Sequence, residues 1–427
     1  MQPRFLITDF FTWFNKGDAA ILIGLLKLLN SVFPRSEITV LSLTPDIDNL
    51  HFLKYCLCVK SRFFNNYSYR SKSRIKKIKI IPIYLIKAIL ILLSIKFKKI
   101  KLGKDQFILE EYKHNDVIIS VGGGFLGGKK YGSILYTLFL LYYSKIIGKI
   151  VIIYAQSIEP FKSGIVAWFT MFVLNKIDLI FVREQYSYNL LKQYQIKSKI
   201  FLTADTAFLL NELPKDHNMN LIENKVFSEK PLIGITVRYW RFLESKNHKL
   251  LFKNYLITMA KLINYWIAKR NATIILFPQV IGEKYDDDRQ TSLTLYNLLS
   301  KKCKENTMIL TEDFTPEELK SLSGKMDLFI GTRMHSNIFA LSMRVPVVAI
   351  AYEMKTYGIM RMINLEKYVI DIKNISAEKL ISLSELVYEK REEIGKILDT
   401  EIPRLENISF QSMLIVKRYL TKKLYYR

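Results

Sequence analysis

The stretch DVIISVGGGFLGG at residues 116–128 decides the fold class of this chain. Its first six residues form a short apolar run, which is typical of a buried strand, and the run leads directly into Gly122–Gly124. Apolar residues then recur at helical spacing over residues 133–147. A buried strand, a glycine-rich turn and a helix in this order indicate an α/β protein with a parallel sheet.

The same alternation extends outward on both sides of this stretch. Upstream, strands are predicted at residues 5–8 and 37–43, with a helix at 19–29 between them. Downstream, apolar runs predict strands at residues 150–154, 179–182, 231–237, 272–277, 327–330 and 346–350. Strands that alternate with helices of about 10–15 residues favour parallel sheets covered on both faces.

One polar interval divides this pattern into two α/β halves. We predict an N-terminal domain at residues 1–215, a linker at 216–230, a second α/β domain at 231–375 and a helical tail at 376–427. Ligands of open parallel sheets bind at the carboxyl ends of the strands. The polar residues at the strand ends of both halves are therefore expected to converge on a cleft between the domains.

Composition narrows the class of protein. Half of the 427 residues are apolar, which excludes a disordered chain. The three cysteines, Cys56, Cys58 and Cys303, exclude a disulfide scaffold and favour a reducing compartment. Cys56 and Cys58 are too close for a zinc knuckle and no histidine–cysteine cluster completes one, so no metal site is predicted.

The N-terminal residues lack the pattern of a secretory signal. The longest apolar run, residues 80–95, contains Pro82 and Lys87 and is shorter than the roughly 20 residues that span a bilayer. We therefore expect a cytoplasmic protein.

About half of the net charge of +25 lies in one segment, residues 69–104. Twelve lysines and arginines lie there without an acidic residue, on both sides of an aliphatic run. A short apolar segment with basic flanks is typical of a chain that lies on an anionic membrane surface. A buried helix with solvated basic ends is the alternative. Nucleic acid is disfavoured as a partner because the aliphatic run has no role in phosphate binding.

His335 is the strongest candidate for catalysis. It follows a strand, at the entry to a helix, two residues beyond Arg333. Free backbone N–H groups at a helix start bind anions, and an arginine adds a two-pronged clamp. Histidine is suited to proton transfer near neutral pH. A structural histidine that caps the loop is the alternative.

Other strand-end residues favour a small ligand with several negative charges. The candidate cations are Arg183, Arg238 and Lys355, together with Arg333, although each alone could be an ordinary surface charge. Gly122–Gly124 let the backbone approach a ligand closely. This glycine-rich turn lacks the lysine of a P-loop, and its spacing does not fit a dinucleotide fingerprint.

Seven short motifs, in this order, resemble the polysaccharide pyruvyl transferase family. They are NKGD at 15–18, GGG at 122–124, QSIEP at 156–160, REQYS at 183–187, DTAF at 205–208, RMH at 333–335 and YEMK at 352–355. Two positions depart from the family pattern, with Glu159 in place of the usual glycine and Thr206 in place of a common proline. Residues 69–104 and the tail lie outside the resemblance.

The resemblance implies two Rossmann-like domains of GT-B type and transfer of pyruvate from phosphoenolpyruvate to a sugar diol as a cyclic ketal. It implies no cofactor beyond phosphoenolpyruvate as co-substrate, and no metal. His335 is then the expected general acid. Asp18 is either a base or a helix cap. The expected donor-binding residues are Arg183, Arg333, Lys355, Arg238 and Ser336. The expected acceptor-binding residues are Asn15, Asp18, Gly122, Gly123, Gly124 and Gln156.

This interpretation places the enzyme in bacterial or archaeal surface polysaccharide or lipid-linked oligosaccharide synthesis. Its acceptor would be a sugar on a polyprenyl diphosphate, and the enzyme would be peripheral on the inner face of the cell membrane. Two alternatives remain open: a nucleotide-sugar glycosyltransferase of GT-B type, and a membrane-associated assembly factor without turnover.

Overall fold

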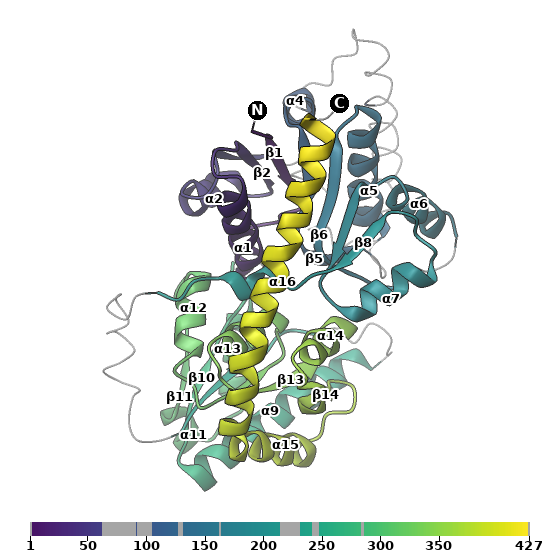
Figure 1. Cartoon of the computed structure of the whole chain (residues 1–427). Helices are drawn as coiled ribbons and strands as arrows, with labels where there is room; N and C mark the ends of the chain where they lie inside the picture. Colours follow the sequence, from purple (N-terminus) through teal and green to yellow (C-terminus); the bar gives the residue numbers. More distant parts are fainter. Residues whose placement is uncertain are drawn as a thin grey trace. The chain divides into compact units, whose positions relative to one another are not determined.

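The computed structural model divides the chain into two compact units (Figure 1). It describes residues 2–61, 91, 105–126, 131–161, 164–213, 231–240, 247–282 and 286–425. Unit 1 comprises Met1–Trp13, Ile21–Thr206 and Ile408–Arg427, and unit 2 comprises Phe14–Ala20 and Ala207–Asn407.

Unit 1 contains a sheet of eight strands in which all pairings are parallel. Its order is β3-β2-β1-β4-β6-β7-β8, and β5 pairs with β6. The strands are β1 (Phe5–Thr8), β2 (Ile38–Ser42), β3 (Cys58–Ser61), β4 (Val117–Ser120), β5 (Gly123–Leu126), β6 (Ile150–Ile158), β7 (Leu179–Val182) and β8 (Lys199–Leu202).

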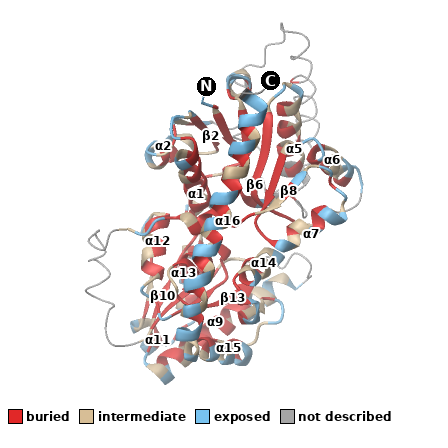
Figure 2. Cartoon of the chain, in the orientation of Figure 1, coloured by how far each residue is buried: buried red, intermediate tan, exposed pale blue. Residues whose placement is uncertain are grey.

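Helices connect these strands, as a parallel sheet requires. They are α1 (Lys16–Val32), α2 (Pro45–Phe52), α4 (Asp105–His114), α5 (Tyr131–Ile146), α6 (Ile165–Leu174) and α7 (Gln185–Gln193), followed by the 3-10 turn η1 (Thr206–Leu209). Strands β1, β2, β4, β6 and β7 are buried along their whole length (Figure 2). This burial explains why the sequences of these strands are continuous apolar runs.

Unit 2 contains a sheet of six parallel strands in the order β11-β10-β9-β12-β13-β14. Its strands are β9 (Leu232–Thr236), β10 (Thr273–Leu276), β11 (Thr307–Ile309), β12 (Leu328–Gly331), β13 (Val347–Ala351) and β14 (Val369–Asp371). Its helices are α9 (His248–Arg270), α10 (Asp288–Asn297), α11 (Lys301–Glu305), α12 (Pro316–Ser323), α13 (Met334–Ser342), α14 (Met354–Met362), η2 (Glu366–Tyr368), α15 (Ala377–Glu389) and α16 (Arg391–Tyr425).

Both sheets are doubly wound. The chain builds three strands outward from β1 or β9 and then continues on the other side of that first strand, with β4 or β12. The reversal creates a topological switch point between β1 and β4 and another between β9 and β12, where open α/β sheets bind ligands. The predicted fold class, α/β with two parallel sheets, is confirmed.

Three features differ from the predicted elements and boundaries. Helix α1 begins at Lys16, so Gly17 lies in its first turn and not in a loop. Gly123–Leu126 of the predicted glycine-rich loop forms strand β5. Phe14–Ala20 groups with unit 2, and the end of the tail, Ile408–Arg427, groups with unit 1. Contacts between residues distant in sequence decide this grouping, and no local pattern reports them.

Other predictions fall on residues that the structure does not describe. The basic segment 69–104 lies outside the described residues except for Ile91, and so does the linker 216–230. Among the residues that the structure describes, no helix is long and apolar enough to cross a membrane.

Candidate active site

The switch point of unit 2 brings together the ends of β9 and β12. Thr236, the last residue of β9, pairs with Gly331, the last residue of β12. The Thr236 hydroxyl accepts hydrogen bonds from the backbone nitrogens of Thr332 (2.9 Å) and Arg333 (3.2 Å). The Ser336 hydroxyl lies 3.1 Å from Thr236 Oγ1 and donates to the Arg333 carbonyl oxygen at 2.7 Å. These bonds fix the turn from β12 into α13.

Arg333, the N-cap of α13, is held by two carboxylates. Its Nε donates to Asp288 Oδ2 at 2.9 Å, and its Nη2 donates to Asp288 Oδ1 at 2.6 Å and to Asp286 Oδ1 at 2.9 Å. Burial alone would lower the pKa of Arg333, but the charges of Asp288 and Asp286 outweigh it and raise that pKa above its ordinary value. The guanidinium is therefore a permanent positive charge at the start of α13.

Arg238, just beyond β9, contacts the same oxygen of Asp286 as Arg333 does. Its Nη2 is 3.6 Å from Asp286 Oδ1. Its guanidinium carbon lies 4.6 Å from the ring centre of Tyr352 and 5.3 Å from that of Trp240, and the two rings are 4.5 Å apart. Cation–π contacts of this kind orient an arginine without neutralising it.

Lys355 contributes a further positive charge from the first turn of α14. Its Nζ is 2.6 Å from Glu353 Oε2 and 5.8 Å from the ring centre of Tyr352. Tyr352 therefore contacts the cationic ends of both Arg238 and Lys355. The predicted donor-binding cations Arg238, Arg333 and Lys355 thus belong to one connected cluster in unit 2.

His335 lies against the NKGD motif. A Cβ atom at Gly17 would lie 2.6 Å from Cγ of His335, so only glycine allows the first turn of α1 to approach the imidazole this closely. Asn15 Oδ1 accepts hydrogen bonds from the backbone nitrogens of Gly17 (3.1 Å) and Asp18 (3.4 Å) and so caps α1. The starts of α1 and α13 therefore meet at His335.

The segment before Gly17 is fixed to the loop after β10. Asn15 forms an antiparallel bridge with Val280, and the Lys16 nitrogen donates to the Gln279 carbonyl oxygen at 3.0 Å. The Lys16 side chain is 1% exposed and pairs with Asp313. Burial lowers the pKa of Lys16, although Asp313 opposes this shift.

Asp288 connects Arg333 to that same loop. Its Oδ2 accepts hydrogen bonds from the backbone nitrogens of Gln279 and Val280, each at 3.0 Å. The loop in turn holds Asn15 and Lys16. Asp288 thus links Arg333 to the loop that contacts the NKGD motif beside His335.

Arg183, predicted to bind the donor, lies in unit 1 and has a different environment. Its side chain is 1% exposed, and its Nη1 is 2.5 Å from Asp205 Oδ2. Its Nε donates to Ser157 Oγ at 2.8 Å and its Nη2 to the Gly123 carbonyl oxygen at 3.1 Å. All three nitrogens bond within the unit, which favours a structural role for Arg183.

The predicted acceptor-binding residues are divided between the two units. Asn15 and Asp18 group with unit 2, whereas Gly122, Gly123, Gly124 and Gln156 group with unit 1. In unit 1, Gly122 contacts the carbonyl of Ala155, where a Cβ atom would lie 2.6 Å from the oxygen. Gln156 is fully buried and donates from Nε2 to the Val121 carbonyl oxygen at 2.6 Å.

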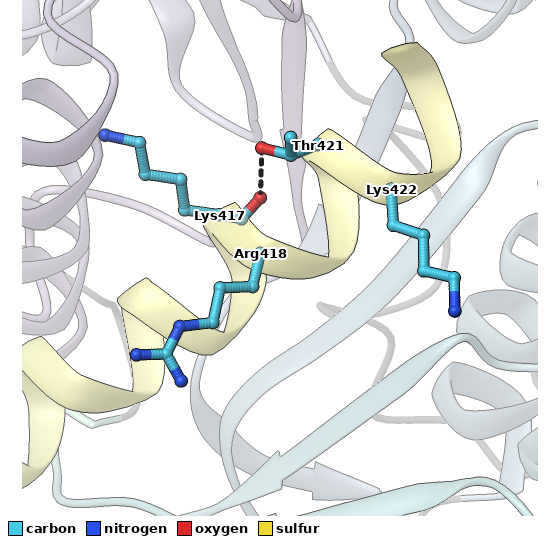
Figure 3. A pocket seen from close by; sticks show the side chains of 4 residues that line it. All are labelled: Lys417, Arg418, Thr421 and Lys422. Carbon is cyan, nitrogen blue, oxygen red and sulfur yellow. Dashed lines mark hydrogen bonds between the residues drawn. The ribbon is translucent and has the colours of Figure 1, made fainter. Parts of the chain in front are cut away.

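A hollow on α16 contains none of the predicted site residues (Figure 3). It is lined by Lys417, Arg418, Thr421 and Lys422. Thr421 Oγ1 donates to the Lys417 carbonyl oxygen at 3.0 Å, and the three cationic side chains point in different directions. Converging charges, which an anion site requires, are therefore present in unit 2 and not in this hollow.

Sequence reasoning missed four residues of the cluster: Thr236, Trp240, Asp286 and Asp288. Thr236 could have been found as the polar residue at the end of an apolar strand. The run of three aspartates at 286–288 was the other available signal. Among the residues that the structure describes, no group of three or more histidine, cysteine, aspartate or glutamate side chains could hold a metal ion.

Comparison with known sequences confirms the resemblance seen in the motifs. The family model described as polysaccharide pyruvyl transferase matches residues 15–354. The amylovoran biosynthesis protein AmsJ of Erwinia amylovora is 27% identical over 397 residues, which cover 92% of this chain and 93% of that protein.

Solved structures with low sequence identity share the fold. A putative UDP-N-acetylglucosamine 2-epimerase from Listeria monocytogenes matches with a TM-score of 0.62 and 14% identity, covering 100% of this chain and 98% of that one. The Anabaena protein HepE, solved with UDP and glucose, matches with a TM-score of 0.57 and 12% identity, covering 98% of this chain and 100% of that one. The GT-B-like architecture predicted from the sequence is confirmed.

Proposed function

Because the chain belongs to the polysaccharide pyruvyl transferase family, we propose that it transfers pyruvate from phosphoenolpyruvate to two hydroxyls of a sugar as a cyclic ketal. The observation that carries this proposal is the cluster in unit 2. There, one histidine lies in the same turn as a fixed arginine, with Arg238 beside it. Phosphoenolpyruvate carries a carboxylate and a phosphate, which such cations bind.

The chemistry requires one proton donor and no redox partner. His335 delivers a proton to the methylene carbon of the enol, which becomes a methyl group. Two C–O bonds form between the central carbon and the sugar hydroxyl oxygens, and the bond from that carbon to the phosphate oxygen breaks. The two hydroxyl protons balance the proton gained by the methyl group and the proton taken by the departing phosphate.

The roles of the other site residues belong to the same proposal, and the positions of these residues support them. Arg238, Arg333 and Lys355 hold the donor, and Ser336 acts by fixing the turn that carries Arg333. Asp18, in the first turn of α1, accepts a hydroxyl proton from the acceptor. The roles of Gly122–Gly124 and Gln156 in binding the acceptor stay predictions.

The name of the relative AmsJ supports a role in polysaccharide biosynthesis for this chain as well. A sugar acceptor linked to a polyprenyl diphosphate, presented at the inner face of an anionic membrane, belongs to the same proposal. The basic composition of the chain supports it, with 64 lysines and arginines against 39 aspartates and glutamates.

The test is turnover with phosphoenolpyruvate and candidate lipid-linked sugars, measured as phosphate release and as a mass gain of the acceptor. His335→Ala is expected to lower turnover by about 10²–10⁴-fold while donor binding persists. Turnover with a nucleotide sugar in place of phosphoenolpyruvate would indicate a glycosyltransferase and contradict the proposal.

A further inference from the structure

Three consecutive aspartates, Asp286, Asp287 and Asp288, lie beside the donor cluster, and their surroundings differ. Asp288 is 1% exposed and bonds to Arg333 and to two backbone nitrogens. Asp287 caps α10, accepting from the Arg289 backbone nitrogen at 2.9 Å, and its Oδ2 is 2.6 Å from Arg289 Nη2. Both carboxylates are thus fixed parts of the local structure.

Asp286 differs because its side chain is 36% exposed and contacts two arginines. Its Oδ1 is 2.9 Å from Arg333 Nη2 and 3.6 Å from Arg238 Nη2. An oxygen anion between two guanidinium groups is also the arrangement in which arginines bind the carboxylate or phosphate of a ligand. Asp286 therefore occupies the place that a bound anion would take.

The two arginines are held independently of Asp286. Asp288 bonds to Nε and to one side of Nη2 of Arg333, so that guanidinium keeps its position without Asp286. Arg238 lies against the rings of Trp240 and Tyr352. Removal of Asp286 would thus leave two oriented positive charges in place.

We propose that Asp286 is a counter-ion that the anionic donor must displace from between Arg238 and Arg333. This inference rests on the proposed function, because it names the donor as the displacing anion. Asp286 is partly exposed, so a dianion in the same place displaces it from the two arginines, whereas the buried Asp288 pair stays intact. Asp286 thereby lowers the affinity for the donor.

The experiment is calorimetric titration of the full-length protein with phosphoenolpyruvate and, separately, with inorganic phosphate. The variants are Asp286→Asn, Asp287→Asn and Asp288→Asn. Each removes one negative charge, and the three positions are adjacent in the sequence. Asp286→Asn is expected to bind phosphoenolpyruvate about threefold to fivefold more tightly than wild type, because the competing pair is lost.

The neighbouring variants are the matched controls. Asp287→Asn is expected to leave the affinity unchanged, and Asp288→Asn to weaken binding, because Arg333 loses its buried partner. Equal or weaker binding by a folded Asp286→Asn protein overturns the inference, as does equal tightening by Asp287→Asn, which would indicate a general charge effect.

The phosphate titration separates this inference from the proposed function. If Asp286→Asn binds phosphate more tightly than wild type but neither protein binds phosphoenolpyruvate, the counter-ion role stands and the donor is wrong. If neither protein binds either anion, both proposals are wrong.

Discussion

Two turns of the molecule each place an arginine between a strand and the following helix, but the two arginines have different surroundings. In unit 1, Arg183 follows β7 and precedes α7; in unit 2, Arg333 follows β12 and precedes α13. Both arginines are buried and both pair with a buried aspartate, Asp205 or Asp288. Arg183 bonds through all three nitrogens inside its unit, whereas Arg333 also bonds to Asp286, which is 36% exposed.

The difference shows how the same sequence feature gives a structural or a functional residue. Arg183 is 1% exposed and each of its three nitrogens bonds within the unit, so it stabilises the fold and is not accessible to a ligand. Arg333 is also buried, but its second partner, Asp286, is partly exposed, so the guanidinium is already oriented toward a carboxylate that a ligand can replace. Strand-end position alone does not separate the two cases.

The largest expected effect is the loss of stability when Arg183, the enclosed arginine of unit 1, is replaced. Arg183→Met should lower the free energy of unfolding by about 3–5 kcal/mol, because Asp205 would remain as a buried charge without its partner. Chemical denaturation measures this loss. Arg4→Met is the matched control in the same unit: its pair with Asp116 has 36% and 25% exposed side chains, and we expect a loss below about 1 kcal/mol. Equal losses in the two variants would contradict the comparison.

The next effect is on the approach of α1 to His335. Gly17→Ala should lower kcat by about 10²-fold. A Cβ atom there would push the His335 imidazole away from the position in which it transfers a proton to the substrate. Steady-state kinetics with phosphoenolpyruvate measures it. Gly395→Ala is the control, since a Cβ atom at Gly395 meets no atom within 4 Å. A Gly17→Ala enzyme with normal kcat would separate His335 from the chemistry.

A smaller effect, on the binding of phosphoenolpyruvate, is expected for Arg238 in the cationic cluster of unit 2. Arg238→Ala should weaken phosphoenolpyruvate binding about tenfold, because a charge-assisted hydrogen bond is worth about 1.5–3 kcal/mol. The free energy of unfolding should change by less than about 1 kcal/mol, since its contact with Asp286 is a partly exposed pair. Calorimetry and denaturation give the two values. A stability loss as large as that of Arg183→Met would mean that Arg238 is structural as well.

The smallest effect concerns Glu184, next to Arg183. Burial raises the pKa of Glu184 above its ordinary value of 4.5, against the opposing charge of Arg183. The folded state therefore keeps a proton that the unfolded state has lost, and stability falls as pH rises from about 4.5 through the raised value. Glu184→Gln should remove this fall, which is at most about 1.4 kcal/mol per pH unit. Parallel pH–stability curves of wild type and variant would exclude the raised pKa.

The elements of the fold were predictable because they depend on local patterns. The apolar runs at residues 116–121 and 327–330 contain strands β4 and β12, and the helical spacing over residues 133–147 corresponds to helix α5. The start of α1 was predicted too late, because glycine and aspartate at positions 17 and 18 read as loop residues. Asn15 caps the helix there, and a helix cap depends on backbone geometry that composition does not report.

The candidate site was predictable only in part. His335 and Arg333 stand out because they end an apolar strand, and Arg238 stands out for the same reason. Which aspartate opposes which arginine was not predictable, since Asp288 and Arg333 are 45 residues apart and Lys16 and Asp313 are 297 residues apart. Ion pairs of this kind depend on which loops the sheet brings to one edge.

The sequence by itself determined the class of fold, the family, and the turn that carries Arg333 and His335, because hydrophobic periodicity and short motifs are local properties of a chain. Only the tertiary structure decided that Phe14–Ala20 groups with unit 2, that Arg183 is enclosed, and that Asp286 stands between two arginines. The physical reason is that burial and ion pairing are properties of neighbours in space, and the strand order of a doubly wound sheet sets those neighbours.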